Sequence, residues 1–195
     1  FSVLKKEFNF DFSSTKYFAG HSLGEYSALV SSESLEYKDA LFLLYERGKA
    51  MQEAVPVGEG SMIAVLGLKL NELNNYIKDI NTKGVCEIAN DNAEGQIIVS
   101  GDKDSINLLK KKLKENNKKA IQLNVSAPFH CSLMNSAAEK MRDKINSINF
   151  KKPNISLISN VTSKPEENPE NIKNLLIKQI SSTVRWRESI IHMSN

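Results

Sequence analysis

A serine with a glycine two residues away on either side stands near the start of the chain, in the segment AGHSLGEYSA at residues 19–28. The apolar residues 17–19 favour a buried strand, and the residues after Ser22 have helical spacing. A strand, a sharp turn that carries the serine and a helix make up a nucleophile elbow. Gly20 and Gly24 suit that turn because a Cβ at either position is expected to crowd the strand or the helix. The segment predicts either a nucleophilic serine at a helix N-terminus or a tight turn that closes a buried strand.

Composition limits the classes of protein that fit the chain. Of its 195 residues, 41% are hydrophobic and 25% charged, which is usual for a folded enzyme with a sizeable core. No apolar run approaches the ~20 residues that a membrane-spanning helix needs. The formal net charge of +3 is too small to indicate nucleic-acid binding, although it suits an acidic partner. Cys86 and Cys131 lie far apart without metal-ligand spacing, so we expect reduced thiols, no metal site, and a cytoplasmic or organelle-matrix protein.

A second helix is predicted over residues 35–54, with Ser34 as its expected N-cap. Its apolar stripe is expected to consist of Leu41, Leu44, Gly48 and Met51. Arg47 borders this stripe, where an arginine needs a negative partner. Arg47 is therefore either a structural side chain, snorkelling or ion-paired, or a contact for a negatively charged substrate.

Short strands and helices are predicted along residues 58–125 in the order β-α-β-β-α-β, which indicates a ferredoxin-like unit. The strands are expected at 62–68, 85–89, 96–100 and 120–125, and the helices at 71–80 and 104–116. The lysine run 110–114 favours a solvated helix face over a docking patch. The loop 90–95 joins the two central strands, and we expect it to reach toward the serine.

One histidine is well placed to activate the serine. His130 lies in SAPFHCSLM, residues 126–134, where a loop joins a helix. The buried face of that helix is expected to hold Leu133, Ala137, Met141 and Ile145. A serine hydroxyl needs a general base, and with the serine upstream His130 is better explained as that base than as a structural residue. His21 is assigned to packing or support, and His192 lies in no motif.

Six motifs follow one another along the chain: AGHSLGEYSAL, ERGKAMQ, NDNAEGQIIVSG, SAPFHCSLM, SNVT and KQISSTVRW. Together they resemble the malonyl-CoA:acyl carrier protein transacylases of type II fatty-acid synthesis and, more distantly, the acyltransferase domains of polyketide and fatty-acid synthases. The resemblance covers almost the whole chain from Tyr17 onward. It implies an α/β-hydrolase-like catalytic subdomain with a parallel sheet at 1–57 and 126–195, and an inserted ferredoxin-like subdomain at 58–125.

The resemblance also implies an activity and the residues that carry it. A malonyl group passes from malonyl-CoA to the phosphopantetheine thiol of an acyl carrier protein, with no cofactor and no metal. Ser22 is then the nucleophile, His130 the general base and Arg47 the clamp on the free malonyl carboxylate. The N–H of Leu23 is one oxyanion-hole donor, and Gln179 helps to orient the imidazole.

Further site residues and partners are expected, in part from the same resemblance. Asn90 and Asn160 match positions that line the cleft. Phe129, beside His130, narrows the space for an α-methyl branch and so favours malonyl over methylmalonyl. The expected partners are coenzyme A and an acidic acyl carrier protein, with no nucleic acid and no membrane, and the expected state is a monomer.

Two segments of the family pattern are absent from this sequence: an initial strand with a Gly-Gln-Gly loop, whose glutamine gives the second oxyanion donor, and a Gly-Pro-Gly loop with a last strand. We therefore expect an internal fragment without a targeting segment.

Two other classes of function stay open for this sequence. An esterase or thioesterase of α/β-hydrolase type is expected to pair its histidine with an Asp or Glu and to need no buried Arg47. A non-catalytic fragment that binds carrier protein is the other, and intact Ser22, Arg47 and His130 argue against it.

Overall fold

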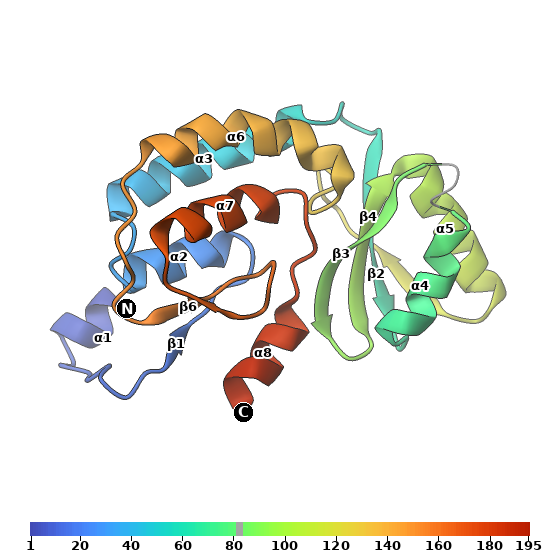
Figure 1. The fold of residues 1–195 in the computed structure, drawn as a ribbon. Helices are drawn as coiled ribbons and strands as arrows, with labels where there is room; N and C mark the ends of the chain where they lie inside the picture. The colour runs from blue at the N-terminus through green and yellow to red at the C-terminus, as the bar shows by residue number, and fades with distance from the viewer. Residues whose placement is uncertain (81–83) are drawn as a thin grey trace.

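The computed structural model describes residues 1–80 and 84–195 as an α/β molecule with two sheets, each packed against its own helices (Figure 1). One sheet with its helices occupies the left of Figure 1 and contains both ends of the chain. The other is formed by the middle of the chain on the right. Within the described residues no helix is long and apolar enough to cross a membrane.

The first sheet has three short strands in the order β1-β6-β7: β1 (Tyr17–Phe18), β6 (Ser156–Ile158) and β7 (Pro165–Glu166). β1 runs parallel to β6, and β7 is antiparallel to β6, so the expected parallel sheet is mixed in the described residues. The helices around it are α2 (Leu23–Ser31), α3 (Tyr37–Glu53), α6 (Asn135–Ser147) and α7 (Pro169–Gln179). They share one apolar core, in which α3 lies alongside α6 (Figure 1).

The buried face of α3 is not the stripe that the sequence predicts. Leu41 is 51% exposed, and the buried side chains are Ala40, Leu43, Arg47, Ala50 and Met51. Two apolar stripes one residue apart both fit helical spacing, and contact with α6 decides between them. Arg47 thus lies on the buried face instead of at its border. Ser34 is not the N-cap either: Glu36 takes that position, and the Ser34 hydroxyl donates to the carbonyl of Lys151.

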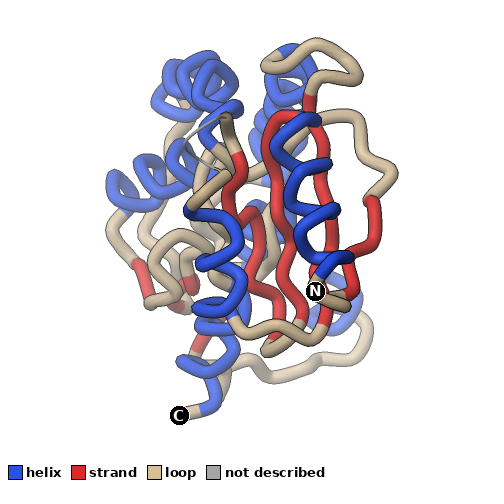
Figure 2. Tube along the Cα trace, turned by 90° about the vertical axis from the view of Figure 1, so that its right-hand side faces the viewer, coloured by secondary structure: helices blue, strands red, loops and turns tan. Residues whose placement is uncertain are grey.

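Six elements in the predicted order form the second unit: β2 (Gly60–Leu66), α4 (Leu70–Lys78), β3 (Cys86–Ala93), β4 (Gln96–Asp102), α5 (Lys103–Glu115) and β5 (Lys119–Gln122). The strand order is β3-β4-β2-β5, and each neighbouring pair is antiparallel. Figure 2, turned toward this unit, shows the strands side by side with helices against them. The central strands β2 and β4 are buried along most of their length.

Alternation along the strands gives the second sheet two different faces. Ile63 and Val65 point toward α4 and α5, where they join the core of this unit. Met62 and Ala64, which alternate with these residues along β2, point to the opposite face. There they form a separate apolar cluster with Ala89 of β3 and Ile98 of β4. Phe129 packs against that cluster from the other unit. The second sheet therefore presents an apolar wall toward the first unit.

The expected loop at 90–95 is mostly strand. β3 continues to Ala93, and only Glu94 and Gly95 form the turn to β4, with Gly95 at a φ of +76° that favours glycine. Two register shifts, between Ile88 and Asn90 and between Asp91 and Ala93, let β3 continue past the predicted end.

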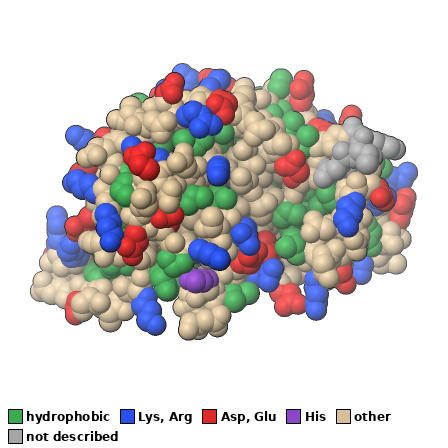
Figure 3. Space-filling model, viewed as in Figure 1, with side chains coloured by type: hydrophobic (Ala, Val, Ile, Leu, Met, Phe, Trp, Pro, Cys, Tyr) green, Lys and Arg blue, Asp and Glu red, His purple; other side chains and the backbone are tan. Residues whose placement is uncertain are grey.

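Three short elements complete the fold: α1 (Ser2–Lys6), the 3₁₀ turn η1 (Ser132–Met134) and α8 (Trp186–Ser194). Because η1 precedes α6, Met134 is buried where Leu133 was expected. Lys and Arg side chains are interspersed with Asp and Glu over the face shown in Figure 3, as a net charge of +3 implies. No cluster of His, Cys, Asp or Glu suited to a metal ion occurs within residues 1–80 and 84–195.

Candidate active site

Ser22 occupies a strained turn between β1 and α2. It is the N-cap of α2 with a φ of 52° and a ψ of −107°, a conformation that costs a non-glycine residue about 1–3 kcal/mol. A Cβ at Gly20 would lie 1.9 Å from the carbonyl oxygen of Gly24, so glycine is required there, as predicted. A Cβ at Gly24 would meet nothing within 4 Å, so the predicted crowding at that position is wrong.

The side chain of Asn160 is hydrogen-bonded to the main chain on both sides of the Ser22 turn. Its Oδ1 accepts from the Ser22 N–H at 2.6 Å, and its Nδ2 donates to the carbonyl of Gly20 at 2.8 Å. Asn160 is 1% exposed and is not part of the pocket lining, so the prediction that it lines the cleft is wrong. Both ends of its amide are hydrogen-bonded to the main chain of the turn, so the Asn160 side chain holds the main chain around the serine in place.

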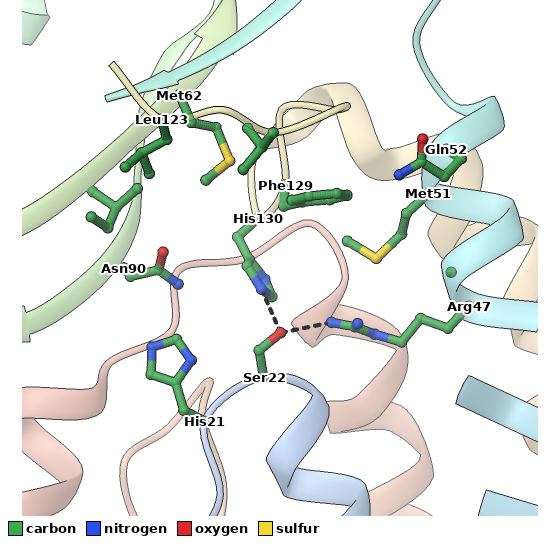
Figure 4. Close-up of a pocket in the computed structure, with 13 residues that line it drawn as sticks. His21, Ser22, Arg47, Met51, Gln52, Met62, Asn90, Leu123, Phe129 and His130 are labelled. Atoms are coloured by element: carbon green, nitrogen blue, oxygen red, sulfur yellow. Dashed lines mark hydrogen bonds between the residues drawn. The ribbon is translucent and has the colours of Figure 1, made fainter. Parts of the chain in front are cut away.

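Ser22 and His130 lie within hydrogen-bond distance although 108 residues separate them. Ser22 Oγ is 2.8 Å from His130 Nε2 (Figure 4). On the other side of the ring, Nδ1 lies 2.9 Å from the main-chain carbonyl oxygen of Gln179. A carbonyl only accepts, so Nδ1 carries the proton and Nε2 presents its lone pair to the serine hydroxyl. This is the arrangement that a general base needs.

Burial and the charge of Arg47 lower the pKa of His130 to about 4, although the Gln179 carbonyl acts in the opposite direction. The imidazole is therefore neutral, and able to accept a proton, well below the pH range in which a histidine side chain ordinarily titrates.

We expect the rate of Ser22 acylation by a neutral acyl-CoA to be nearly equal at about pH 7.5 and pH 5.5. An imidazole with the ordinary pKa would lose about nine-tenths of its neutral form over that interval. Single-turnover rates measure the difference, and a midpoint near 6.5 would contradict it.

Arg47 reaches the serine from α3 and is 7% exposed. Its Nη2 donates to Ser22 Oγ at 2.9 Å and to Gln179 Oε1 at 3.1 Å. Its Nε has no hydrogen-bond partner, and no ion pair with a carboxylate includes Arg47 in the part of the chain that the structure describes. The structural alternative, an ion pair within the protein, is therefore absent there. A buried cation without a paired anion suits a negatively charged ligand.

Gln179 lies at the end of α7 and is fully buried. Its main-chain carbonyl orients the imidazole of His130, whereas its side-chain amide contacts Arg47, Ser22 and Glu25. The predicted position beside the histidine therefore holds, but the group that contacts the ring belongs to the main chain.

A pocket of about 390 Å³ opens above Ser22, between the two units of the fold (Figure 4). Asn90 and Phe129, two of the predicted substrate contacts, line it. The Nδ2 of Asn90 is buried and has no hydrogen-bond partner within residues 1–80 and 84–195. His21 also lines the pocket, where its Nε2 lies 2.9 Å from Asn92 Oδ1 and its ring lies edge-on to Trp186. The remaining lining residues are Ser22, Arg47, Gly48, Met51, Gln52, Met62, Ile98, Leu123, Val125 and His130.

The main-chain N–H of Leu23 is the first of α2, and no acceptor for it is present among the described residues. N–H groups in the first turn of a helix have no partner within the helix and carry the positive end of its dipole. Because Leu23 directly follows the serine, this N–H is available to an oxyanion formed at Ser22.

One buried residue of this site, Glu25, was not among the sequence-predicted site residues. It lies three positions after Ser22 in the first turn of α2 and is 1% exposed. An acidic residue in the first turn of a helix is common, because it complements the helix dipole at the surface. The signal that sets Glu25 apart is its place beside the apolar residues that bury α2, namely Tyr26, Ala28 and Leu29.

Ser22, in a strained turn of an α/β fold, is hydrogen-bonded to the neutral imidazole of His130. This arrangement defines a nucleophilic site of the serine–histidine class. The chain belongs to the acyl transferase domain family, which matches residues 14–195.

Named relatives agree with this assignment. The chain is 43% identical over 174 residues to the malonyl CoA-acyl carrier protein transacylase of Bacillus subtilis, covering 88% of this chain and 55% of that protein. It is 37% identical over 177 residues to the enzyme of that name from Escherichia coli K12, covering 90% and 57%. The chain thus spans little more than half the length of these relatives.

Solved structures of similar proteins show the same fold. An acyl-carrier-protein S-malonyltransferase from Bartonella henselae superposes with a TM-score of 0.94 at 40% identity, over 98% of this chain and 62% of that one. A malonyl-transacylase solved in complex with its type II polyketide-synthase acyl carrier protein superposes with a TM-score of 0.93 at 34% identity, over 98% and 62%.

Proposed function

We propose that the protein containing this chain transfers a malonyl group from malonyl-CoA to the phosphopantetheine thiol of an acyl carrier protein through a malonyl-Ser22 intermediate. The relatives named above carry that activity in their names, and one of them was solved with a carrier protein. The observation that carries the proposal within this chain is the buried guanidinium of Arg47, which forms no ion pair with a carboxylate among the described residues and lies 2.9 Å from Ser22 Oγ.

In the first half-reaction, Ser22 Oγ attacks the thioester carbonyl as His130 Nε2 takes the hydroxyl proton. The carbonyl oxygen becomes an oxyanion near the Leu23 N–H and the N-terminus of α2. When the tetrahedral intermediate collapses, the carbon–sulfur bond breaks and the leaving thiolate of coenzyme A takes the proton from His130. The products are malonyl-Ser22 and free coenzyme A.

The second half-reaction reverses these steps with a different thiol. His130 accepts the proton of the phosphopantetheine thiol, the sulfur attacks the malonyl ester, and the proton returns to Ser22 Oγ when the carbon–oxygen bond breaks. A hydrolase would admit water instead. The esterase alternative predicts a carboxylate at His130 Nδ1, where this chain has the neutral carbonyl of Gln179, so the geometry favours transfer.

Arg47 gives the site its preference for a charged acyl group. A guanidinium and a carboxylate form a strong charge-assisted pair when both are shielded from water, and acetyl offers no such partner. The aromatic ring of Phe129, which lines the pocket beside His130, limits the room for a branch at the α carbon. Malonyl-CoA thus fits better than acetyl-CoA or methylmalonyl-CoA.

The two units correspond to the subdomains that the proposed function needs. The strand order β3-β4-β2-β5 with two helices on one face supports a ferredoxin-like unit inserted at 58–125. The elbow between β1 and α2 supports an α/β-hydrolase-like unit at 1–57 and 126–195. The inserted unit supplies Met62, Asn90 and Ile98 to the pocket wall, so both units shape the substrate site.

Arg47→Ala tests the proposal through acyl selection. We expect acylation by malonyl-CoA to fall by roughly 10- to 100-fold, the range expected for a charge-assisted hydrogen bond. Acylation by acetyl-CoA should change far less, because its methyl group makes no use of the guanidinium. Arg47→Lys should recover only part of the loss, since an ammonium keeps the charge but not the planar fork. Kinetics with the two acyl-CoA substrates measure the ratio.

Arg142→Ala is the matched control, because Arg142 lies on the exposed face of α6, paired with Glu139. It should leave both rates unchanged. Equal losses for malonyl and acetyl in Arg47→Ala would show that Arg47 is structural and would overturn the assignment of a carboxylate substrate.

A further inference from the structure

The carboxyl group of Glu25 is buried in the first turn of α2, next to the Ser22 turn. Oε2 of Glu25 accepts a hydrogen bond from Gln179 Nε2 at 2.6 Å and from the Asn160 N–H at 3.4 Å. Burial raises the pKa of Glu25 to about 7, with the two hydrogen bonds and the charge of Arg47 acting in the opposite direction. Because burial of a carboxyl group is costly, its place in this network indicates a role beyond filling space.

The side-chain amide of Gln179 is held between acceptors and a donor. Its Nε2 faces the Glu25 carboxyl and the main-chain carbonyl of Ser22, at 2.6 and 3.0 Å. Its Oε1 accepts from Arg47 Nη2 at 3.1 Å. A reversed amide would place Oε1 against two oxygens and the NH₂ group against a guanidinium that can only donate. Glu25 therefore helps to fix a single orientation of the amide.

That orientation matters for the position of Arg47. Nη2 of Arg47 divides its contacts between Gln179 Oε1 and Ser22 Oγ. If the amide turned, the guanidinium would lose its only side-chain anchor besides the nucleophile among the described residues. The pocket lining does not include Glu25, so its effect on the substrate is indirect, and Gln179 is the side chain that connects Glu25 to Arg47 by hydrogen bonds.

We propose that Glu25 is a positioning residue for acyl selection: its carboxyl holds the Gln179 amide, and the amide holds the Arg47 guanidinium at the Ser22 hydroxyl. The inference rests on the proposed function, because it takes Arg47 as the partner of the malonyl carboxylate. It deepens that function by tracing the choice of substrate to a residue outside the pocket.

A double-mutant cycle with Glu25→Met and Gln179→Met in the protein that carries this sequence tests this series of contacts. Methionine fills a similar volume and provides no strong acceptor. We expect Glu25→Met to lower the malonyl-to-acetyl ratio of kcat/KM about tenfold, mainly through KM for malonyl-CoA. Glu25→Gln, which keeps an acceptor oxygen at the same place, should restore most of the ratio. In the Gln179→Met background, Glu25→Met should have no further effect on it.

Asp91→Asn is the matched control, because Asp91 is another buried carboxylate, 2% exposed and ion-paired with Arg187 at 2.8 Å. It should lower the melting temperature and leave the ratio unchanged. Independent, additive effects of Glu25→Met and Gln179→Met, or equal losses with both substrates, would overturn the inference.

Two further comparisons keep the test decisive. If Glu25→Met does not fold, Glu25→Asp withdraws the carboxyl by one methylene and should lower the ratio in the same way. A wild-type protein without malonyl preference would overturn the proposed function. A preference that survives both Glu25→Met and Glu25→Asp would overturn only the role of Glu25.

Discussion

We expect Ser22→Ala to abolish acylation by malonyl-CoA. The wild-type protein, mixed briefly with malonyl-CoA, should gain the mass of one malonyl group, and peptide mapping should place it on the peptide that contains Ser22. The loss should be complete because the hydroxyl is the attacking group and alanine provides no substitute. Alanine also fits the turn no better than serine does, since the positive φ of 52° strains either residue. Intact-mass spectrometry of both proteins measures the result.

Ser27→Ala is the control for this experiment, because Ser27 lies on the exposed side of the same helix, α2. It should be labelled as the wild type is. Labelling that persists in Ser22→Ala, or that maps to the buried thiol of Cys131, would contradict the assignment of the nucleophile.

We expect His130→Ala to slow acylation by about 10²–10⁴-fold, the usual contribution of a general base. Nε2 of His130 is the proton acceptor at 2.8 Å from Ser22 Oγ, and Arg47 Nη2, the other group bonded to that oxygen, can only donate. Binding of coenzyme A should be nearly unchanged, because the imidazole contacts the nucleophile and not the leaving group's nucleotide. Single-turnover acylation and equilibrium binding of coenzyme A separate the two effects.

The matched control is His192→Ala, since His192 lies on α8 with its ring 5.8 Å from that of Tyr17 and outside the pocket lining. Its acylation rate should equal that of the wild type. A His130→Ala protein within a factor of about three of the wild-type rate would show that another group accepts the proton.

The parts of the site that the sequence predicts are those fixed by local geometry. The turn at Ser22 needs glycine at position 20, a short apolar run precedes it, and the residues after it have helical spacing. His130 stands at a loop-to-helix junction that can be recognised without knowledge of the fold. Its own positive φ of 60° was not foreseen, because no pattern of neighbouring residues marks it.

The parts that the sequence does not predict depend on which segments meet in space. Arg47 lies on the buried face of α3 because α6 packs there, and helical spacing alone allows the neighbouring stripe equally well. Asn160 was assigned to the cleft, yet its amide is used by the main chain around Ser22, a contact across 138 residues. The role of the Gln179 main chain is likewise invisible in its residue type, since any residue has a carbonyl there.

In the second sheet, too, local sequence predicts some features, and tertiary contacts determine the others. Its order of elements follows from alternating patterns and turn residues, so the six elements appear in the predicted order. The end of β3 was misplaced because the polar run of residues 90–92 is typical of a loop. In the fold Asn90 and Asp91 remain paired with β4, and Asn90 also bridges to Val184. The polar end of β3 is a strand because of its place beside the pocket, which its amino-acid composition does not reveal.

The most direct test of the proposed function is the fate of the purified acyl-enzyme. The protein is acylated with malonyl-CoA, freed of excess substrate, and divided between buffer alone and buffer with a carrier protein that bears phosphopantetheine. We predict that the malonyl group stays on Ser22 in buffer and moves to the carrier protein when the thiol is present, as mass spectrometry of both proteins would show. Rapid release of free malonate in buffer, with no transfer to the thiol, would contradict the account and favour a hydrolase.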